Sequence, residues 1–179
     1  TLAHVDPEEL TAAARLLSGS PFAEHEEAVT SVGYVTILRA AAAVTGWDEE
    51  TVRACAAAIG DLGEAIGLLR PSETPGGMTV AQTDRFFRDL AKLRKPAEKR
   101  EALEAVLGRS AAVEAKYLLK TLSGGLRIGA DVTTLEEAIA QAFSQDREAV
   151  ARARRDSGDV GETAAAAREG RLAQIRFRL

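Results

Sequence analysis

The chain has 179 residues, a formal net charge of -4 at pH 7 and a single cysteine, Cys55. This length suits one domain, and the hydrophobic fraction of 46% is sufficient for a core, although aromatic residues make up only 4%. One cysteine excludes an internal disulfide, and no apolar run approaches the roughly 20 residues of a membrane span. The acidic balance argues against a generic nucleic-acid binder, so a DNA-binding surface would need local patches of cations.

Helix signals dominate the first part of the chain. Asp6 followed by Pro7 and two glutamates is typical of a helix start, and apolar residues then recur at helical spacing up to Gly19. Two further apolar stretches are likewise delimited by acidic residues or glycines. We therefore predict three helices here, over residues 7–18, 32–44 and 49–59.

The second part of the chain continues the helical pattern. Thr79 and Gln82 match a capping box at the start of a helix, and residues 102–107 form a short amphipathic stretch that ends at Gly108. Ser110 is expected to cap the following helix, whose apolar stripe ends at Leu122. The last six residues, 174–179, alternate between apolar and polar, which is typical of a strand.

An internal repeat relates the two parts of the chain. The proline- and glycine-rich stretch 71–77 separates a first half, about 6–70, from a second half, about 78–170. Residues 60–64, GDLGE, match residues 158–162, GDVGE, at an offset of 98, whereas Leu17-Ser18-Gly19 matches Leu122-Ser123-Gly124 at an offset of 105. The shared order indicates a duplication, and the helical pattern predicts an all-α single domain of about ten helices in two halves.

The repeated GDxGE sequence has a structural explanation. Its first glycine ends one helix, the aspartate caps the next helix, and the glutamate three residues later completes a capping box. Each half is then a helix, a loop, a helix, a tight Gly-Asp turn and another helix.

The segment TLSGGLRIGAD, residues 121–131, places three glycines and Arg127 at a helix junction. Gly124 and Gly129 have the spacing of a nucleotide-binding P-loop, but Ala130 and Asp131 stand where that loop needs lysine and then serine or threonine. The segment also follows a helix instead of a strand, so we exclude a nucleotide site. Two explanations stay open: a turn whose amides and arginine bind phosphate, or a helix stop followed by a tight crossing.

Residues 114–143 resemble the N-terminal DNA-binding domain of ATP-dependent DNA ligases, which carries an L-x-G-x-L-R-x-G segment after an amphipathic helix. Residues 78–93 and 95–110 also resemble segments of that family, and both GDxGE turns occur at the expected places. The resemblance covers most of residues 8–179. It implies two halves related by a pseudo-twofold axis and a grip on nicked duplex DNA through the minor groove and the phosphates, without base readout.

The same resemblance implies which residues contact DNA. The signature turn of the family touches the phosphodiester backbone, although many members have an arginine where Gly125 stands. Lys99 corresponds to a lysine of the preceding helix, and the turn that begins at Ser18 corresponds to the signature turn in the first half. The expected DNA-binding residues are Gly124, Gly125, Arg127, Gly129, Lys99, Lys120, Ser18 and Gly19.

The expectations for the rest of the protein also come from this resemblance. The catalytic lysine of the family lies in a K-x-D-G motif, which these 179 residues lack, so the chain should be inactive alone and should need no cofactor or metal. ATP and magnesium are expected in a missing catalytic domain, to which residues 171–179 would begin the connection. The expected partners are nicked double-stranded DNA and the adenylation and OB-fold domains of a parent ligase. The expected location is cytoplasmic, with roles in DNA repair, replication and recombination.

One alternative belongs to a different class. Two duplicated alanine-rich halves could form a helical-repeat module that binds another protein, and the acidic balance permits it. A module of that class would expose an apolar groove, whereas DNA binding needs exposed cations.

Overall fold

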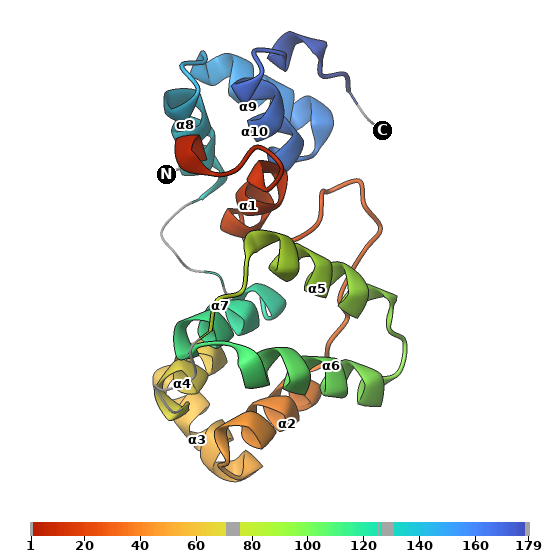
Figure 1. The fold of residues 1–179 in the computed structure, drawn as a ribbon, viewed down its shortest axis with the longest axis vertical. Helices are drawn as coiled ribbons and strands as arrows, with labels where there is room; N and C mark the ends of the chain where they lie inside the picture. Colours follow the sequence, from red (N-terminus) through yellow and green to blue (C-terminus); the bar gives the residue numbers. More distant parts are fainter. Residues whose placement is uncertain (1, 71–75, 125, 127–130, 178–179) are drawn as a thin grey trace. The chain divides into compact units, whose positions relative to one another are not determined.

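A computed structural model describes residues 2–70, 76–124, 126 and 131–177 (Figure 1). Within these residues the chain forms ten α-helices, two short 3-10 helices and no strand, which confirms the predicted all-α class. The helices group into two compact units. We call residues 29–126 the central unit and residues 1–28 with 127–179 the terminal unit, and each is described by itself.

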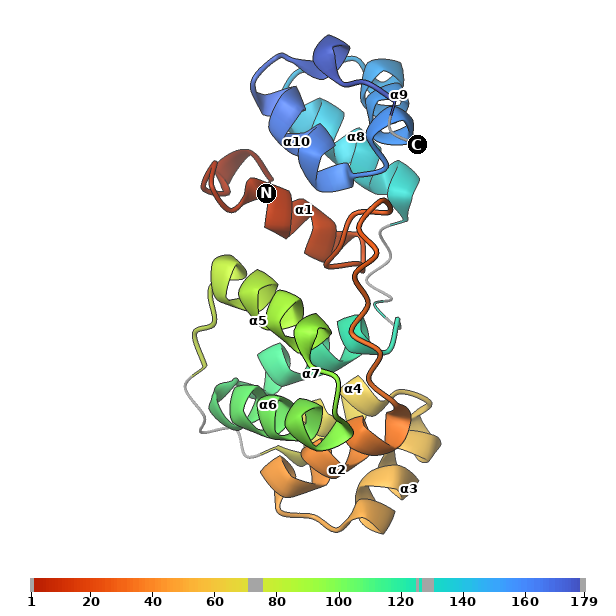
Figure 2. The ribbon, with the colours of Figure 1, turned by 90° about the vertical axis from the view of Figure 1, so that its right-hand side faces the viewer.

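The central unit contains six helices. Helix α2 packs along α6, α4 packs along α7, and α3 lies against α4 (Figures 1 and 2). Large apolar side chains from α2, α4, α5, α6 and α7 are buried in this unit, as the periodicity of the sequence requires. The helices are α2 (Tyr34–Thr45), α3 (Glu49–Ile59), α4 (Leu62–Leu69), α5 (Val80–Lys92), α6 (Pro96–Arg109) and α7 (Ala112–Leu122).

The terminal unit combines the two ends of the chain. Helix α1 packs on α10, while α9 contacts both α8 and α10 (Figures 1 and 2). A continuous core includes Leu10 from the start of the chain together with Ile139 and Val150 from the end. Its elements are η1 (Leu2–His4), α1 (Leu10–Leu17), α8 (Val132–Ala142), α9 (Arg147–Ser157), α10 (Val160–Arg168) and η2 (Leu172–Gln174).

Most predicted helix ends follow from local capping. Gly46 ends α2 in the left-handed conformation, Asp48 caps α3, and Thr79 with Gln82 forms the predicted capping box of α5. Asp131 caps α8 by accepting a hydrogen bond of 2.7 Å from the Thr134 amide.

Three local predictions are wrong, and a fourth holds only in part: Asp61 caps α4, but the Glu64 carboxylate pairs with Lys116 and Lys120 instead of completing a capping box. The first helix begins at Leu10 and not at Pro7, because residues 7–9 form a turn after Asp6. Ser110 ends α6, where its hydroxyl donates to the Val106 carbonyl, and the Glu114 carboxylate instead accepts from the Ala111 amide at the start of α7. Residues 175–177 form neither helix nor strand.

The compact units do not follow the two halves of the sequence. By the repeat, α1 to α4 correspond to α7 to α10, yet α1 packs on α10 of the second repeat and α7 packs on α4 of the first. Each unit therefore contains three consecutive helices of one repeat and the leading helix of the other. The proline- and glycine-rich stretch 71–77 falls within the sequence limits of the central unit.

The second glycine of each GDxGE sequence allows α7 to cross α4, and α1 to cross α10, at close range. A Cβ atom on Gly63 would lie 2.7 Å from the carbonyl oxygen of Lys116 in α7. A Cβ atom on Gly161 would lie 2.5 Å from the carbonyl oxygen of Thr11 in α1. Any larger residue would force the helices apart, so the motif is needed for packing as well as for capping.

Candidate nucleic-acid interface

The predicted signature turn begins where α7 ends. Gly124 adopts the left-handed conformation with φ 67°, and its amide donates to the Thr121 carbonyl at 3.3 Å. Gly124 is exposed, and a Cβ atom there would meet nothing within 4 Å, so its requirement for glycine is conformational. Gly124 therefore stops the helix, whereas Gly125, Arg127 and Gly129 lie outside the described residues.

The turn of the first half has the same local geometry at Ser18 and Gly19. The Ser18 hydroxyl donates to the carbonyl three residues earlier at 2.7 Å, as the Ser123 hydroxyl does at 3.2 Å. Gly19 is left-handed, with φ 86°, and its amide also bonds to the carbonyl three residues earlier. Both serines are exposed, so the repeat produces two matching exposed turns, at the ends of α1 and α7.

Lys120 lies buried at the contact between α7 and α4. Its ammonium is 2.9 Å from the Asp61 carboxylate and 3.1 Å from the Glu64 carboxylate. Hydrogen bonds to these two carboxylates raise the pKa of Lys120, and they outweigh the opposing effect of burial. Its charge is therefore balanced within the central unit, and a contact between Lys120 and DNA stays a prediction.

Lys99 is also buried, with 7% of its surface exposed. Its ammonium donates to the carbonyl oxygens of Thr30 and Ser31, at 2.6 and 3.1 Å. Ser31 has a positive φ of 45°, which is uncommon for a residue other than glycine. Lys99 thus fixes the backbone that leads into α2, and a contact with DNA stays a prediction here too.

Exposed cations lie elsewhere in the described chain. Arg94 is exposed and makes no ion pair within the described residues, although the nearby Lys92 and Lys95 pair with Asp89 and Glu98. Other arginines share its exposure and its lack of an ion pair among the described residues. They are Arg53, Arg85 and Arg109 in the central unit and Arg152, Arg155, Arg168 and Arg176 in the terminal unit.

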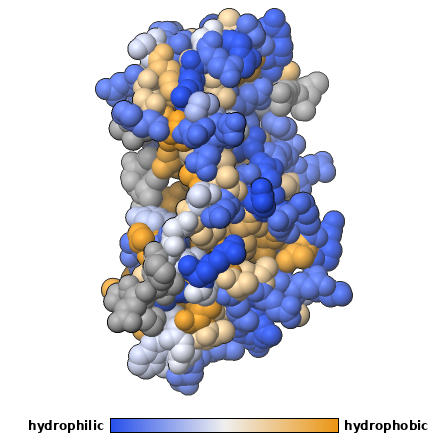
Figure 3. All heavy atoms as spheres, viewed as in Figure 1, coloured by the Kyte–Doolittle hydropathy of each residue, from blue (hydrophilic) through white to orange (hydrophobic). Residues whose placement is uncertain are grey.

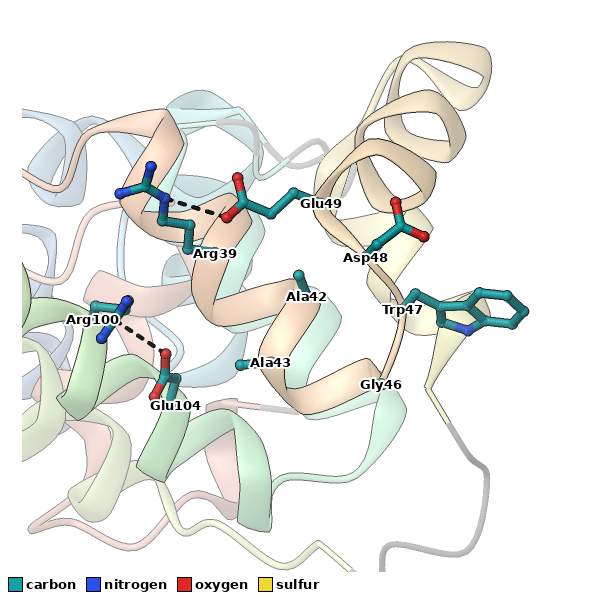
Figure 4. A pocket seen from close by; sticks show the side chains of 9 residues that line it. All are labelled: Arg39, Ala42, Ala43, Gly46, Trp47, Asp48, Glu49, Arg100 and Glu104. Atoms are coloured by element: carbon teal, nitrogen blue, oxygen red, sulfur yellow. Dashed lines mark ion pairs between the residues drawn. The ribbon is translucent and has the colours of Figure 1, made fainter.

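A shallow groove of about 710 Å³ opens on the central unit beside α2 and α6 (Figure 4). Ala42 and Ala43 line it between two ion pairs, Arg39 with Glu49 and Arg100 with Glu104. Trp47, half exposed, extends at its edge away from both pairs. Because each arginine is matched by a carboxylate, the groove adds no excess positive charge, and its lining is mostly polar. No pattern in the sequence indicated this groove.

None of the described helices is long and apolar enough to cross a membrane. Within the described ranges, no group of three or more histidine, cysteine, aspartate or glutamate residues could hold a metal ion. Hydrophilic residues cover most of the face seen in Figure 3, with apolar residues in smaller areas.

The fold defines an all-helical domain built from a duplicated four-helix sequence. Residues 1–140 match the protein family described as "DNA ligase N terminus". The chain therefore belongs to the DNA ligase N-terminal family, as the resemblance of its signature segment indicates.

Curated relatives agree with this family. A "Probable DNA ligase" of Koribacter versatilis is 39% identical over 167 residues, which cover 91% of this chain and 29% of the relative. A "Probable DNA ligase" of Opitutus terrae is 30% identical over 98% of this chain and 21% of its own length. A "DNA ligase" of Methanoculleus marisnigri is 29% identical over 93% of this chain and 32% of its own length. The chain thus spans less than a third of each of these relatives.

Proposed function

We propose that this chain is the DNA-binding domain of a DNA ligase and that it grips nicked duplex DNA through phosphates and the minor groove. The observation that carries the proposal is the pair of matching exposed turns, which begin at Ser18 and Ser123. A left-handed glycine without a side chain lets the backbone of such a turn approach phosphate oxygens closely. A ligase acts at any sequence, so contacts to phosphates serve it better than contacts to base edges.

Arginines supply the charge that such a grip requires. Arg127 lies in the signature turn, and Arg94 and Arg109 are exposed on the central unit without an ion pair among the described residues. Each cation that neutralises a phosphate releases counterions, so the affinity should fall steeply as salt rises. The excess of carboxylates then belongs on surfaces that face away from DNA.

We also propose that the domain works as part of a longer ATP-dependent ligase. The relatives named as DNA ligases are more than three times as long as the matched region. Adenylation and OB-fold domains, ATP and magnesium would then act outside this chain, during repair, replication or recombination in the cytoplasm. The helical-repeat interaction module is less well supported, because the groove beside Trp47 is lined mostly by charged residues.

A salt titration tests the proposal. Fluorescence anisotropy with a nicked duplex, measured at several salt concentrations, should show binding at low salt that weakens as salt rises. Arg127→Ala should weaken binding to all sequences and reduce the slope of log affinity against log salt by about one unit.

Arg53→Ala is the matched control for this titration, because Arg53 is an exposed arginine of α3 outside both turns. It should leave the salt slope unchanged. If the unaltered chain binds no duplex at low salt, the proposal fails. If both substitutions lower the slope equally, the signature turn has no special role.

A further inference from the structure

Helices α1 and α7, each of which packs on a helix of the other repeat, carry a cation at equivalent positions. With the offset of 105 that aligns Ser18 with Ser123, Arg15 of α1 aligns with Lys120 of α7. Arg15 reaches the Asp159 carboxylate in two contacts, Nε to Oδ1 at 3.0 Å and Nη2 to Oδ2 at 2.5 Å. The repeat therefore conserves a cation three residues before each exposed turn, and each cation is bound to the capping aspartate of another helix.

Each of these aspartates has two roles. Asp61 accepts a hydrogen bond from the Glu64 amide at the start of α4, and Asp159 accepts one from the Gly161 amide at the start of α10. Burial opposes the ionisation of both aspartates, but the hydrogen bonds from Lys120 and Arg15 and those from the helix amides outweigh it, so the pKa of each is lowered. Ionised aspartates thus join the start of one helix to the end of another.

The close crossing fixes this geometry further. The carbonyls that approach Gly63 and Gly161 belong to Lys116 and Thr11, which also align at the offset of 105. Each carbonyl lies one helical turn before the cation. The last turns of α7 and α1 are therefore held at two points, a backbone contact and an ion pair, directly before the residues that turn away.

From these contacts we infer that Lys120 and Arg15 are positioning residues: they hold the ends of α7 and α1 so that the following turns meet DNA phosphates, and they do not bind phosphate themselves. This inference rests on the proposed function. Only 8% of the Lys120 side chain and 13% of the Arg15 side chain are exposed, and both charges are matched by carboxylates. A phosphate would have to displace those carboxylates to reach either cation.

Lys120→Met separates positioning from direct contact, because methionine keeps the apolar stem and removes the charge. We expect a severalfold loss of affinity for nicked duplex with an unchanged salt slope, whereas loss of a phosphate ligand would lower the slope by about one unit. Lys120→Arg should restore the affinity, since arginine serves at the equivalent position 15. A lowered slope, or full affinity in the Lys120→Met variant, would overturn the inference.

Hydrogen exchange provides a readout that does not depend on DNA. Lys120→Met should accelerate exchange of the Ser123 and Gly124 amides and leave those of Ser18 and Gly19 unchanged, and Arg15→Met should do the reverse. Each variant is thus the control for the other. Unchanged exchange at both turns would refute positioning, even if the unaltered chain failed to bind DNA and the proposed function were lost. If Lys120→Met unfolds the chain, Asp61→Asn tests the same pair with a smaller change in shape.

Discussion

The crossing of α1 with α10 and the crossing of α7 with α4 solve the same packing problem with different ion pairs. In the terminal unit, Arg15 binds Asp159 through two parallel contacts, and only 2% of the Asp159 side chain is exposed. In the central unit, the single ammonium of Lys120 is shared between Asp61 and Glu64, whose side chains are 24% and 36% exposed. Arg15 also pairs with Glu26 at 3.1 Å, so each cation has two carboxylate partners, but only the planar guanidinium binds one of them through two parallel contacts.

The hydrogen bonds and ion pairs around Asp159 and Asp61 also differ. Around Asp159, the Ser157 hydroxyl bonds to the backbone, and the loop after α1 adds a hydrogen bond from the Glu24 amide to the Gly158 carbonyl. Each cation has a second carboxylate at 3.1 Å, Glu26 for Arg15 and Glu64 for Lys120, but Glu64 also pairs with Lys116 at 2.8 Å. The crossing of α1 and α10 should therefore allow fewer arrangements of the two helices, and the loss of one group there should lower the free energy of unfolding more.

The largest expected effect is that of Asp159→Ala. It removes a helix cap and leaves the guanidinium of Arg15 with only the more exposed Glu26 as a partner, which should lower the free energy of unfolding by about 3–5 kcal/mol. Urea unfolding followed by far-UV circular dichroism measures the loss. Fluorescence of Trp47, the one tryptophan of the chain, reports on the central unit alone and should change less.

Asp61→Ala is the matched variant in the central unit. Each cation keeps a second carboxylate, Glu64 or Glu26, but Asp61 is more hydrated than Asp159, so its loss should cost less than Asp159→Ala. Equal losses in the two variants would remove the distinction between the crossings.

A smaller effect is expected from Gly63→Ala. The added Cβ would meet the Lys116 carbonyl at 2.7 Å, so the helices must separate, at a cost of about 1–3 kcal/mol. Gly108→Ala in α6 is the control within the same unit, since a Cβ there meets nothing within 4 Å. The control should stabilise the unit by about 0.5–1 kcal/mol, because alanine favours a helix. Both variants are compared by Trp47 fluorescence in urea, and a neutral Gly63→Ala would contradict the close crossing.

The smallest expected effect is a difference at alkaline pH. The pKa of Lys120 is raised in the folded state, so its contribution is complete below its unfolded value of about 10.4 and is lost as pH rises through the folded value. Arg15 stays protonated throughout this range. The unfolding midpoint seen by Trp47 should therefore fall above about pH 10.5, and Lys120→Arg should reduce that fall. If the unaltered chain and the Lys120→Arg variant have the same pH profile, ionisation of Lys120 does not contribute to the loss of stability at alkaline pH.

The outcomes at particular residues show what local sequence can predict. Gly46, Asp48 and Thr79 form the predicted helix ends because capping involves partners within four residues along the chain. Ser110 failed as a cap because a competing acceptor, Glu114, also lies within that range, and the Glu114 carboxylate further accepts from the amides of Gly77 and Met78. That second contact depends on tertiary structure, which the local pattern does not contain.

The candidate site likewise has features that the sequence predicts and features that only the tertiary structure decides. The sequence predicted the exposed turn at Gly124 and its counterpart at Gly19, since the repeated Leu-Ser-Gly segment is visible in the chain. It also placed Lys99 and Lys120 among the DNA-binding residues, whereas the structure buries both against oxygen atoms of the central unit. The alignment of the repeats at an offset of 105 could have predicted the burial of Lys120, because it pairs Lys120 with Arg15 and so indicates a shared structural role.

By itself, the sequence determined the helical class, the duplication and most helix boundaries, because these depend on periodicity and on contacts between near neighbours. Only the tertiary structure decided that α1 belongs with α10 and α7 with α4, and therefore which cations are buried. Apolar stripes are non-directional and would suit either partner, so the choice is made by the close approach at Gly63 and Gly161 and by the ion pairs that this approach allows.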